Sequence, residues 1–158
     1  MIKIEKLKRA DITNAYKFIQ KNLMDFPLSP KHSRVHWAER FNPKYVADDL
    51  FWSEDYACVV AKSDGKIVGL VNGYLDSGIV WFSWLLIDKK FRRKGLGSQL
   101  TLATEQIYKK KGYHKAVAET LPNNTRSNKL LKKIGYVIEA KLRKHYAKQD
   151  YFQWAKWL

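Results

Sequence analysis

The stretch Arg92-Arg93-Lys94-Gly95-Leu96-Gly97-Ser98 joins an apolar run that ends at Ile87 to a helical pattern that begins near Lys94. The apolar run, residues 79–87, is rich in β-branched and aromatic residues and predicts a buried strand. A strand, a glycine-containing loop and a helix start together gather free backbone N–H groups and the positive end of a helix dipole. The stretch therefore predicts an anion-binding loop.

The residue types in this loop have separate uses. Gly95 and Gly97 let the backbone approach a ligand or take positive φ, while Arg92, Arg93 and Lys94 add positive charge. A tight turn with a solvated basic loop is the simpler alternative. The spacing differs from the dinucleotide-binding and Walker patterns. It resembles the R/Q-x-x-G-x-G/A acetyl-CoA loop of the GCN5-related N-acetyltransferase (GNAT) family, matched by Arg92, Gly95 and Gly97.

Composition indicates a basic globular protein. At 158 residues the chain fits one domain, residues 1–158, with a core of its own. Its net charge of +15 comes from 30 Lys+Arg against 15 Asp+Glu. Such a field would speed the binding of a polyanion such as CoA, or serve an acidic, RNA or ribosomal partner, or be a solvated lysine-rich surface.

Several classes of protein and site do not fit the sequence. No signal peptide pattern is present and no apolar run approaches about 18 residues, so we expect a cytoplasmic protein outside the membrane. The single cysteine, Cys58, lies in an apolar run and is expected to pack, not to react. His32 and His36 lack a third ligand in register, so no metal site is expected.

The order of predicted elements indicates a single α/β domain. We expect a strand near residues 2–7, a helix from Asp11 to about Asn22, and an irregular helical region at 31–52 whose aromatic residues line an acceptor pocket or the core. Three antiparallel strands, a helix and a parallel strand follow, and then a short helix and two strands. These later segments are expected at 56–62, 66–75, 79–87, 94–111, 115–121, 124–134, 136–142 and 151–158. The prediction is a mixed, mostly antiparallel sheet of about six to seven strands flanked by about four helices.

A second signature of the same family follows the glycine loop. GNAT proteins often carry N-x-x-A/S-x-x-L-Y-x-K-x-G-F/Y on a helix, and residues 124–136 resemble it. The positions that fit are Asn124, Ser127, Leu130, Lys133, Gly135 and Tyr136. Leu131 stands where the family usually has Tyr. With both motifs, the chain is identified as a member of the GNAT family, similar to its ribosomal-protein N-acetyltransferases, and the acyl-CoA N-acyltransferase fold is implied.

The resemblance implies a binding site for acetyl-CoA as cosubstrate. Residues 92–98 would bind the pyrophosphate, and the β-strand backbone at 85–87 would pair with the pantetheine arm. That pairing needs a strand edge opened by splaying, which a bulge after Trp84 could produce. Asn124 would contact CoA, cap its helix, or do both. The implied CoA-binding residues are Leu85, Leu86, Ile87, Arg92, Arg93, Lys94, Gly95, Leu96, Gly97, Ser98, Asn124, Asn128 and Lys133.

The implied chemistry is direct transfer of an acetyl group to a primary amine in a ternary complex. An ammonium must first lose a proton, and Glu119 occupies the strand position where related enzymes often have a catalytic Glu. Pairing of Glu119 with nearby lysines is the structural alternative. A backbone N–H near Leu86 or Ile87 could polarise the thioester carbonyl.

The leaving group is the open point of this mechanism. Leu131 cannot protonate the CoA thiolate, so Tyr146 or Ser127 would do so, or the thiolate would leave without a dedicated acid. A further possibility is a chain that binds CoA and catalyses poorly.

A second copy of the chain is a candidate partner, as a homodimer. The expected acceptor is a small-molecule or protein amine. Acidic residues would offset the repulsion of a cationic acceptor by the basic chain. Four of them lie together at Asp48, Asp49, Glu54 and Asp55. The competing function is a nucleic-acid or ribosome-binding module with a vestigial CoA site, using Tyr146, Tyr151 and Trp154 beside Lys144 and Lys148.

Overall fold

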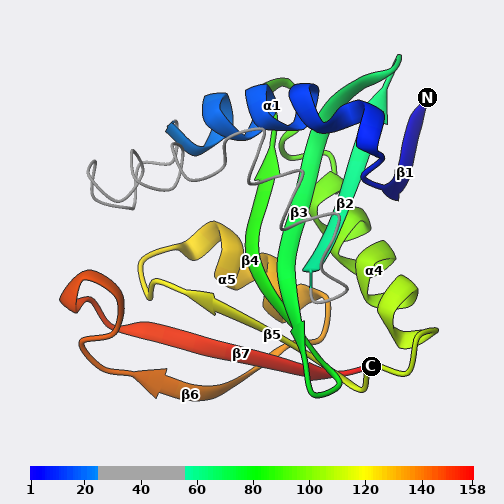
Figure 1. Cartoon of the computed structure of the whole chain (residues 1–158). Helices are drawn as coiled ribbons and strands as arrows, with labels where there is room; N and C mark the ends of the chain where they lie inside the picture. Colours follow the sequence, from blue (N-terminus) through cyan, green and yellow to red (C-terminus); the bar gives the residue numbers. More distant parts are fainter. Residues whose placement is uncertain (25–55) are drawn as a thin grey trace.

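The computed structural model describes residues 1–24 and 56–158. Its seven strands form one sheet in the order β1-β2-β3-β4-β5-β7-β6 (Figure 1). The strands are β1 (Ile2–Lys6), β2 (Tyr56–Ser63), β3 (Lys66–Asp76), β4 (Ile79–Ile87), β5 (Lys115–Thr120), β6 (Val137–Leu142) and β7 (Tyr151–Trp157). The helices are α1 (Ile12–Met24), α4 (Leu96–Lys109) and α5 (Thr125–Lys133), with 3-10 turns η1 (Arg9–Asp11), η2 (Lys89–Phe91) and η3 (Tyr146–Lys148).

The sheet confirms the predicted fold class. Only the pairing of β4 with β5 is parallel, as the strand, helix and strand of residues 79–120 predicted, and the other pairings are antiparallel. The expected helical region at 31–52 lies outside the described residues, as do the acidic residues between 48 and 55. No helix in the described ranges is both long and apolar enough to cross a bilayer.

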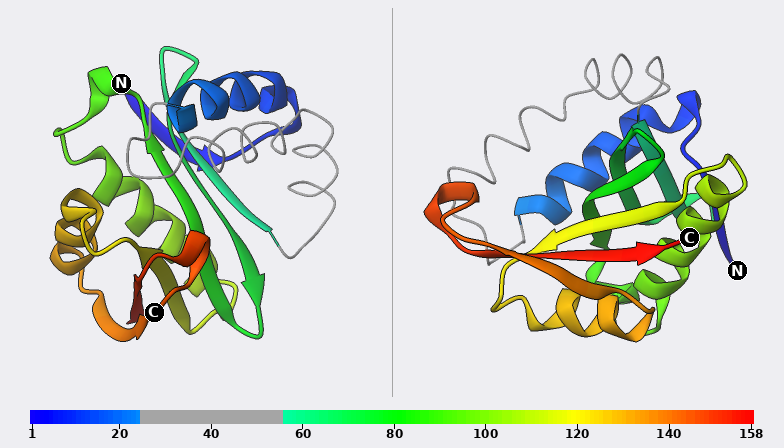
Figure 2. Two further views of the ribbon diagram at one scale, coloured as in Figure 1. Left: turned by 90° about the vertical axis from the view of Figure 1, so that its left-hand side faces the viewer. Right: turned by 90° about the horizontal axis from the view of Figure 1, so that it is seen from below.

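Helices cover both faces of the sheet. Figure 2 shows α1 on one side and α4 with α5 on the other. Successive side chains of β3 point to opposite faces, so Leu70 packs in the cluster that contains α1, and Val71 packs in the cluster that contains Leu96 and Leu100 of α4. Cys58 belongs to the first cluster, and burial raises the pKa of its thiol to about 12, so it is a packing residue as predicted.

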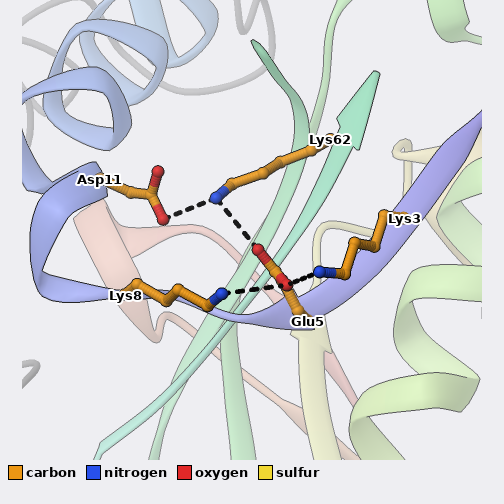
Figure 3. A network of polar contacts seen from close by, with 5 residues as sticks. All are labelled: Lys3, Glu5, Lys8, Asp11 and Lys62. Atoms are coloured by element: carbon orange, nitrogen blue, oxygen red, sulfur yellow. Dashed lines mark hydrogen bonds and ion pairs between the residues drawn. The ribbon is translucent and has the colours of Figure 1, made fainter. Parts of the chain in front are cut away.

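Ionic contacts tie β1 and η1 to β2. Lys62 Nζ lies 2.6 Å from Asp11 Oδ2 and 3.1 Å from Glu5 Oε1, and Lys3 and Lys8 also contact Glu5 (Figure 3). The hydrogen bonds from Lys3 and Lys62 lower the pKa of Glu5 to about 2. The hydrogen bond to Asp11 raises the pKa of Lys62. This network fixes the edge of the sheet away from the strands that carry the candidate site.

The sheet opens between β4 and β5. These strands pair only over residues 79–82 and 115–118, and Figure 1 shows β5, β7 and β6 turning away from β2, β3 and β4. On the other side of β4, Gly73 pairs with Phe82 and Asn72 with Trp84, which leaves Ser83 as the bulged residue.

The expected bulge after Trp84 was therefore placed wrongly, because it lies one residue before Trp84. The physical reason lies on the neighbouring strand. A Cβ on Gly73 would stand 2.0 Å from the carbonyl oxygen of Trp81, so only glycine permits this close approach.

Candidate active site

The glycine loop begins at the end of β4 and leads into α4. Asp88 accepts a hydrogen bond from the Lys90 N–H at 3.0 Å, and Arg92 Nε donates to the carbonyl oxygen of Ile87 at 2.8 Å. Arg93 and Gly95 then take left-handed φ values of 65° and 78°. The loop is thus folded back on the strand end, and α4 starts directly after it.

Helix α4 begins with donors that its own turns do not use. Its first bond runs from the Gln99 N–H to the Gly95 carbonyl at 3.1 Å, and the N–H groups just before Gln99 point out of the helix start. The dipole adds partial positive charge at the same place. Residues 92–98 therefore bring basic side chains and unused N–H groups to one helix start, and anion binding there stays a prediction.

Gly97 also has a packing role that the sequence did not indicate. A Cβ at this position would lie 2.9 Å from Leu130 Cδ1 of α5 and 3.6 Å from Leu85 Cδ2 of β4. Helix α4 therefore approaches α5 and β4 closely at its first turn. The missing side chain serves helix packing as well as ligand access.

The backbone of β4 beyond the bulge faces the opening. Ser83 is exposed and Leu85 and Ile87 are only half-buried, although β4 is the central strand of the sheet. Leu86 points the other way into the α1 cluster. Since β5 pairs no further than Ala118, the backbone of β4 at residues 83–87 has no β5 partner on this side.

Helix α5 is fixed to the end of β5 by side-chain hydrogen bonds. Asn124 Oδ1 accepts from the Ser127 N–H at 3.2 Å, so Asn124 is the helix N-cap. Asn128 accepts from the Thr120 hydroxyl and donates to the carbonyls of Leu121 and Pro122. The Asn128 amide is therefore engaged within the protein.

Two further positions of the motif on α5 are Lys133 and Leu131. Lys133 is exposed at the far end of the helix from Asn124. Leu131 is buried in a cluster with Ala118 and Trp154, so it is a core residue.

Glu119 lies on the opposite face of the sheet from α5. It pairs with Gln153 in the β5–β7 register, and 19% of its side chain is exposed. His145 Nε2 stands 3.3 Å from Glu119 Oε2. Burial, and next the charge of Glu119, raise the pKa of the Tyr74, Tyr146 and Tyr151 hydroxyls. The proposed base and the candidate acid Tyr146 are therefore brought together.

The turn between β6 and β7 holds His145 and Tyr146 over Glu119. Three of its non-glycine residues, Lys144, Ala147 and Lys148, have left-handed φ between 48° and 59°. The turn is closed by His145 N–H donating to the Gln149 carbonyl at 2.7 Å. Strained backbone of this kind is kept where it positions a side chain.

Aromatic rings surround Glu119, and sequence reasoning missed their gathering. Tyr74 and Trp81 stack with ring centroids 5.6 Å apart and an interplanar angle of 5°. His145, Tyr146 and Tyr151 contact one another edge to face. The available signal was the hairpin register, because counting back from the turn after Asp76 places Tyr74 opposite Trp81.

The proposed RNA-binding strip is not one surface. Trp154 is buried, and its Nε1 donates to the Thr120 hydroxyl at 2.8 Å. It is therefore unavailable to stack on a base together with Tyr146 and Tyr151. Tyr151 and Trp154 are three positions apart on β7 and therefore lie on opposite faces, as alternation along the predicted strand already implies.

Glu119 has no lysine or arginine partner among the described residues, because lysines near it pair with other carboxylates. Glu139 pairs with Lys115 at 2.7 Å, and Asp150 pairs with Lys141 at 3.1 Å. The structural alternative for Glu119, pairing with nearby lysines, finds no support within residues 1–24 and 56–158. In those same ranges no group of three or more His, Cys, Asp or Glu side chains could hold a metal ion.

A sheet opened between β4 and β5, with a glycine loop and a helix N-terminus at its mouth, defines an acyl-CoA-binding transferase fold. The chain belongs to the acetyltransferase (GNAT) family, whose model matches residues 22–136. The protein is accordingly an N-acetyltransferase with acetyl-CoA as the acetyl donor.

Individual relatives are distant. An aminoglycoside N(6')-acetyltransferase type 1 of Salmonella typhimurium is 25% identical over 111 residues, 63% of this chain and 77% of that protein. PaiA N-acetyltransferase from Thermoplasma acidophilum, solved with coenzyme A, superimposes with a TM-score of 0.84 at 18% identity, over 100% of this chain and 99% of the other. The ribosomal-protein-S18-alanine N-acetyltransferase of Escherichia coli gives 0.75 at 19% identity, over 99% and 94%. The similarity to these two structures shows the fold.

Proposed function

We propose that the protein moves an acetyl group from acetyl-CoA directly to a primary amine in a ternary complex, with Glu119 as general base. One observation carries the proposal. In a chain with a net charge of +15, Glu119 has no lysine or arginine partner among the described residues, and it lies beside the opening between β4 and β5. A carboxylate there without a lysine or arginine partner, and with His145 as its neighbour, is suited to receive the ammonium of a substrate.

Charge and backbone donors support CoA binding at the donor half of the site. The basic loop and the first turn of α4 offer positive charge and N–H donors to the pyrophosphate. The edge of β4 at residues 83–87 offers backbone groups to the pantetheine arm. Asn124 and Lys133 remain proposed CoA contacts, whereas the Asn128 amide would have to give up its internal hydrogen bonds to become one.

Transfer requires a neutral amine. In the proposed step the substrate ammonium gives a proton to Glu119, directly or through water, and the nitrogen lone pair bonds to the acetyl carbonyl carbon. The carbon–sulfur bond breaks and CoA leaves as a thiolate that takes up a proton. A β4 backbone N–H beyond Ser83 would stabilise the charge that develops on the carbonyl oxygen.

Tyr146 is the group that we assign to protonate the thiolate. Burial and the neighbouring Glu119 raise the pKa of its hydroxyl, which keeps the phenol protonated at neutral pH. Replacing Tyr146 with Phe should lower kcat by about 10- to 100-fold and leave CoA affinity unchanged. An unchanged kcat at every pH would remove Tyr146 from the mechanism.

The test of the function combines binding and turnover. Titration calorimetry should show CoA binding with a Kd of about tens of micromolar or tighter. Thiol release should then be followed with three kinds of amine, namely simple alkylamines, an aminoglycoside and a peptide with an N-terminal alanine, because the relatives act on such different acceptors. Absence of CoA binding would overturn the whole proposal, and binding without thiol release would overturn the transfer step.

A further inference from the structure

We call Tyr74, Trp81, Tyr146 and Tyr151 the aromatic wall. Building on the proposed function, we propose that the acceptor is an arylalkylamine, whose ammonium binds Glu119 while its ring packs against Tyr74 and Trp81 of this wall. Its rings come from three separate parts of the chain and meet beside one carboxylate. Neither a helix end nor a loop alone creates this arrangement.

Sheet register places the wall next to Glu119. Tyr74 of β3 is opposite Trp81 of β4, and Trp81 is opposite Val117 of β5. Glu119 is two residues beyond Val117 on the same strand, so its side chain points to the same face as the ring of Trp81. Burial, and next the negative charge of Glu119, raise the pKa of the Tyr74 hydroxyl, which agrees with the proximity of the two side chains.

The wall presents ring surface that the fold leaves uncovered. Tyr74 is 42% exposed and Tyr146 is 56% exposed, although both lie beside a largely covered carboxylate. The rings of Tyr74 and Trp81 are parallel within 5° and stack on each other, so the ring of an acceptor can extend the stack on the exposed side of Tyr74. An ammonium close to aromatic faces gains cation–π attraction in addition to its contact with Glu119.

Charge favours a single ammonium over a polycation. Two other carboxylates at this end of the sheet, Glu139 and Asp150, are already paired with Lys115 and Lys141. Glu119 lies beside the wall without a lysine or arginine partner among the described residues, and Asp76 is the other described carboxylate whose charge acts on Tyr74. Each additional charge on an acceptor would meet the field of a chain with a net charge of +15.

The experiment compares acceptors of matched size on the wild-type protein. We expect kcat/KM for phenethylamine to exceed that for 2-cyclohexylethylamine by about 10-fold, because the saturated ring cannot stack. Spermidine and kanamycin should fall at least about 10-fold below phenethylamine. The thiol-release assay measures all four at saturating acetyl-CoA.

Variants test the wall itself. Replacing Tyr74 with Leu should lower kcat/KM for phenethylamine by about 10-fold, mainly through KM, whereas Tyr74→Phe should retain most of it because the ring remains. Trp157→Leu is the matched control, since Trp157 is 72% exposed on β7 and stacks on His114 outside the wall. CoA affinity should be the same in all three variants.

The outcomes separate the two proposals. Turnover of spermidine or kanamycin as fast as phenethylamine, or a Tyr74→Leu variant as active as the wild type, would overturn the arylalkylamine assignment and leave the acetyl transfer intact. Failure of every amine in the presence of bound CoA would overturn both.

Discussion

The donor side and the acceptor side of the candidate site are built in different ways. The donor side is a continuous piece of chain, residues 83–98, in which strand, loop and helix start follow one another. The acceptor side is assembled from β3, β4, β5, β7 and the turn before β7. The first is made of backbone groups and the second of side chains.

This difference explains why the donor side can be predicted from a short sequence motif and the acceptor side cannot. Backbone N–H groups, glycines and helix ends are local features, so a short motif describes them. The direction and distance of Glu119, Tyr74 and Trp81 depend on strand register, which is set by pairing between distant segments. A donor site of this kind can be shared by proteins whose acceptors differ.

The largest effect that would test this division is expected from Gly97→Glu. A carboxylate at the first turn of α4 would occupy the anion site and oppose the helix dipole, so CoA affinity should fall by at least about 100-fold. The fold should persist, because the crowded atom is the end of the flexible Leu130 side chain. Calorimetry and thermal unfolding measure the two properties.

Gln106→Glu is the control for this variant. Gln106 is exposed on the same helix, about two and a half turns along, and the substitution adds the same charge away from the loop. It should bind CoA like the wild type. A Gly97→Glu protein with a CoA Kd within about threefold of the wild type would refute the donor site.

A smaller effect on CoA affinity is expected from Asn128→Ala. This variant distinguishes a residue that stabilises the fold from one that contacts CoA. Its amide joins α5 to the end of β5, so the substitution should lower the free energy of unfolding by about 1–3 kcal/mol. CoA affinity measured well below the unfolding temperature should change less than about threefold. Lys129→Ala, an exposed neighbour, is the control. Normal stability with a large loss of CoA affinity would instead make Asn128 a ligand contact.

The smallest effect is expected from Lys62→Met, away from both sides. It should lower Tm by about 2–5 °C at pH 7 without changing CoA affinity or turnover. The folded pKa of Glu5 is lowered to about 2, so the contribution of the network is present at neutral pH and is lost as pH falls towards that value.

The Tm difference between Lys62→Met and the wild type should therefore shrink as the pH is lowered from neutral. Lys66→Met, an exposed lysine on β3, serves as the control. A difference that grows in acid would contradict the assigned network.

Much of the fold followed from local pattern. The apolar run at 79–87, the turn signals and the glycine loop predicted β4, the hairpins and α4 because each depends on neighbouring residues. The bulge was misplaced because Gly73, on the adjacent strand, decides where β4 must deform. That information is absent from the sequence of β4 itself.

Of the described residues that we propose for the acceptor side, the sequence analysis assigned a catalytic role to Glu119 and Tyr146, and its other acceptor candidates at 31–52 and 48–55 lie outside the described residues. Tyr146 was a candidate acid and Glu119 a candidate base, yet the sequence did not show that they meet. Trp154 and Tyr151 were grouped by proximity in sequence, although strand alternation separates them. Register between strands was the missing information for Glu119 and Tyr146, whereas alternation along the predicted strand at 151–158 is enough to separate Trp154 from Tyr151.

The most direct test of Glu119 as general base is Glu119→Gln compared with Glu139→Gln. Both substitutions remove one negative charge from the same end of the sheet, but Glu139 is already paired with Lys115. Glu119→Gln should bind CoA with unchanged affinity and lose at least about 100-fold in kcat, while Glu139→Gln should keep both. Glu119→Gln with wild-type kcat across the pH range would contradict the proposed role.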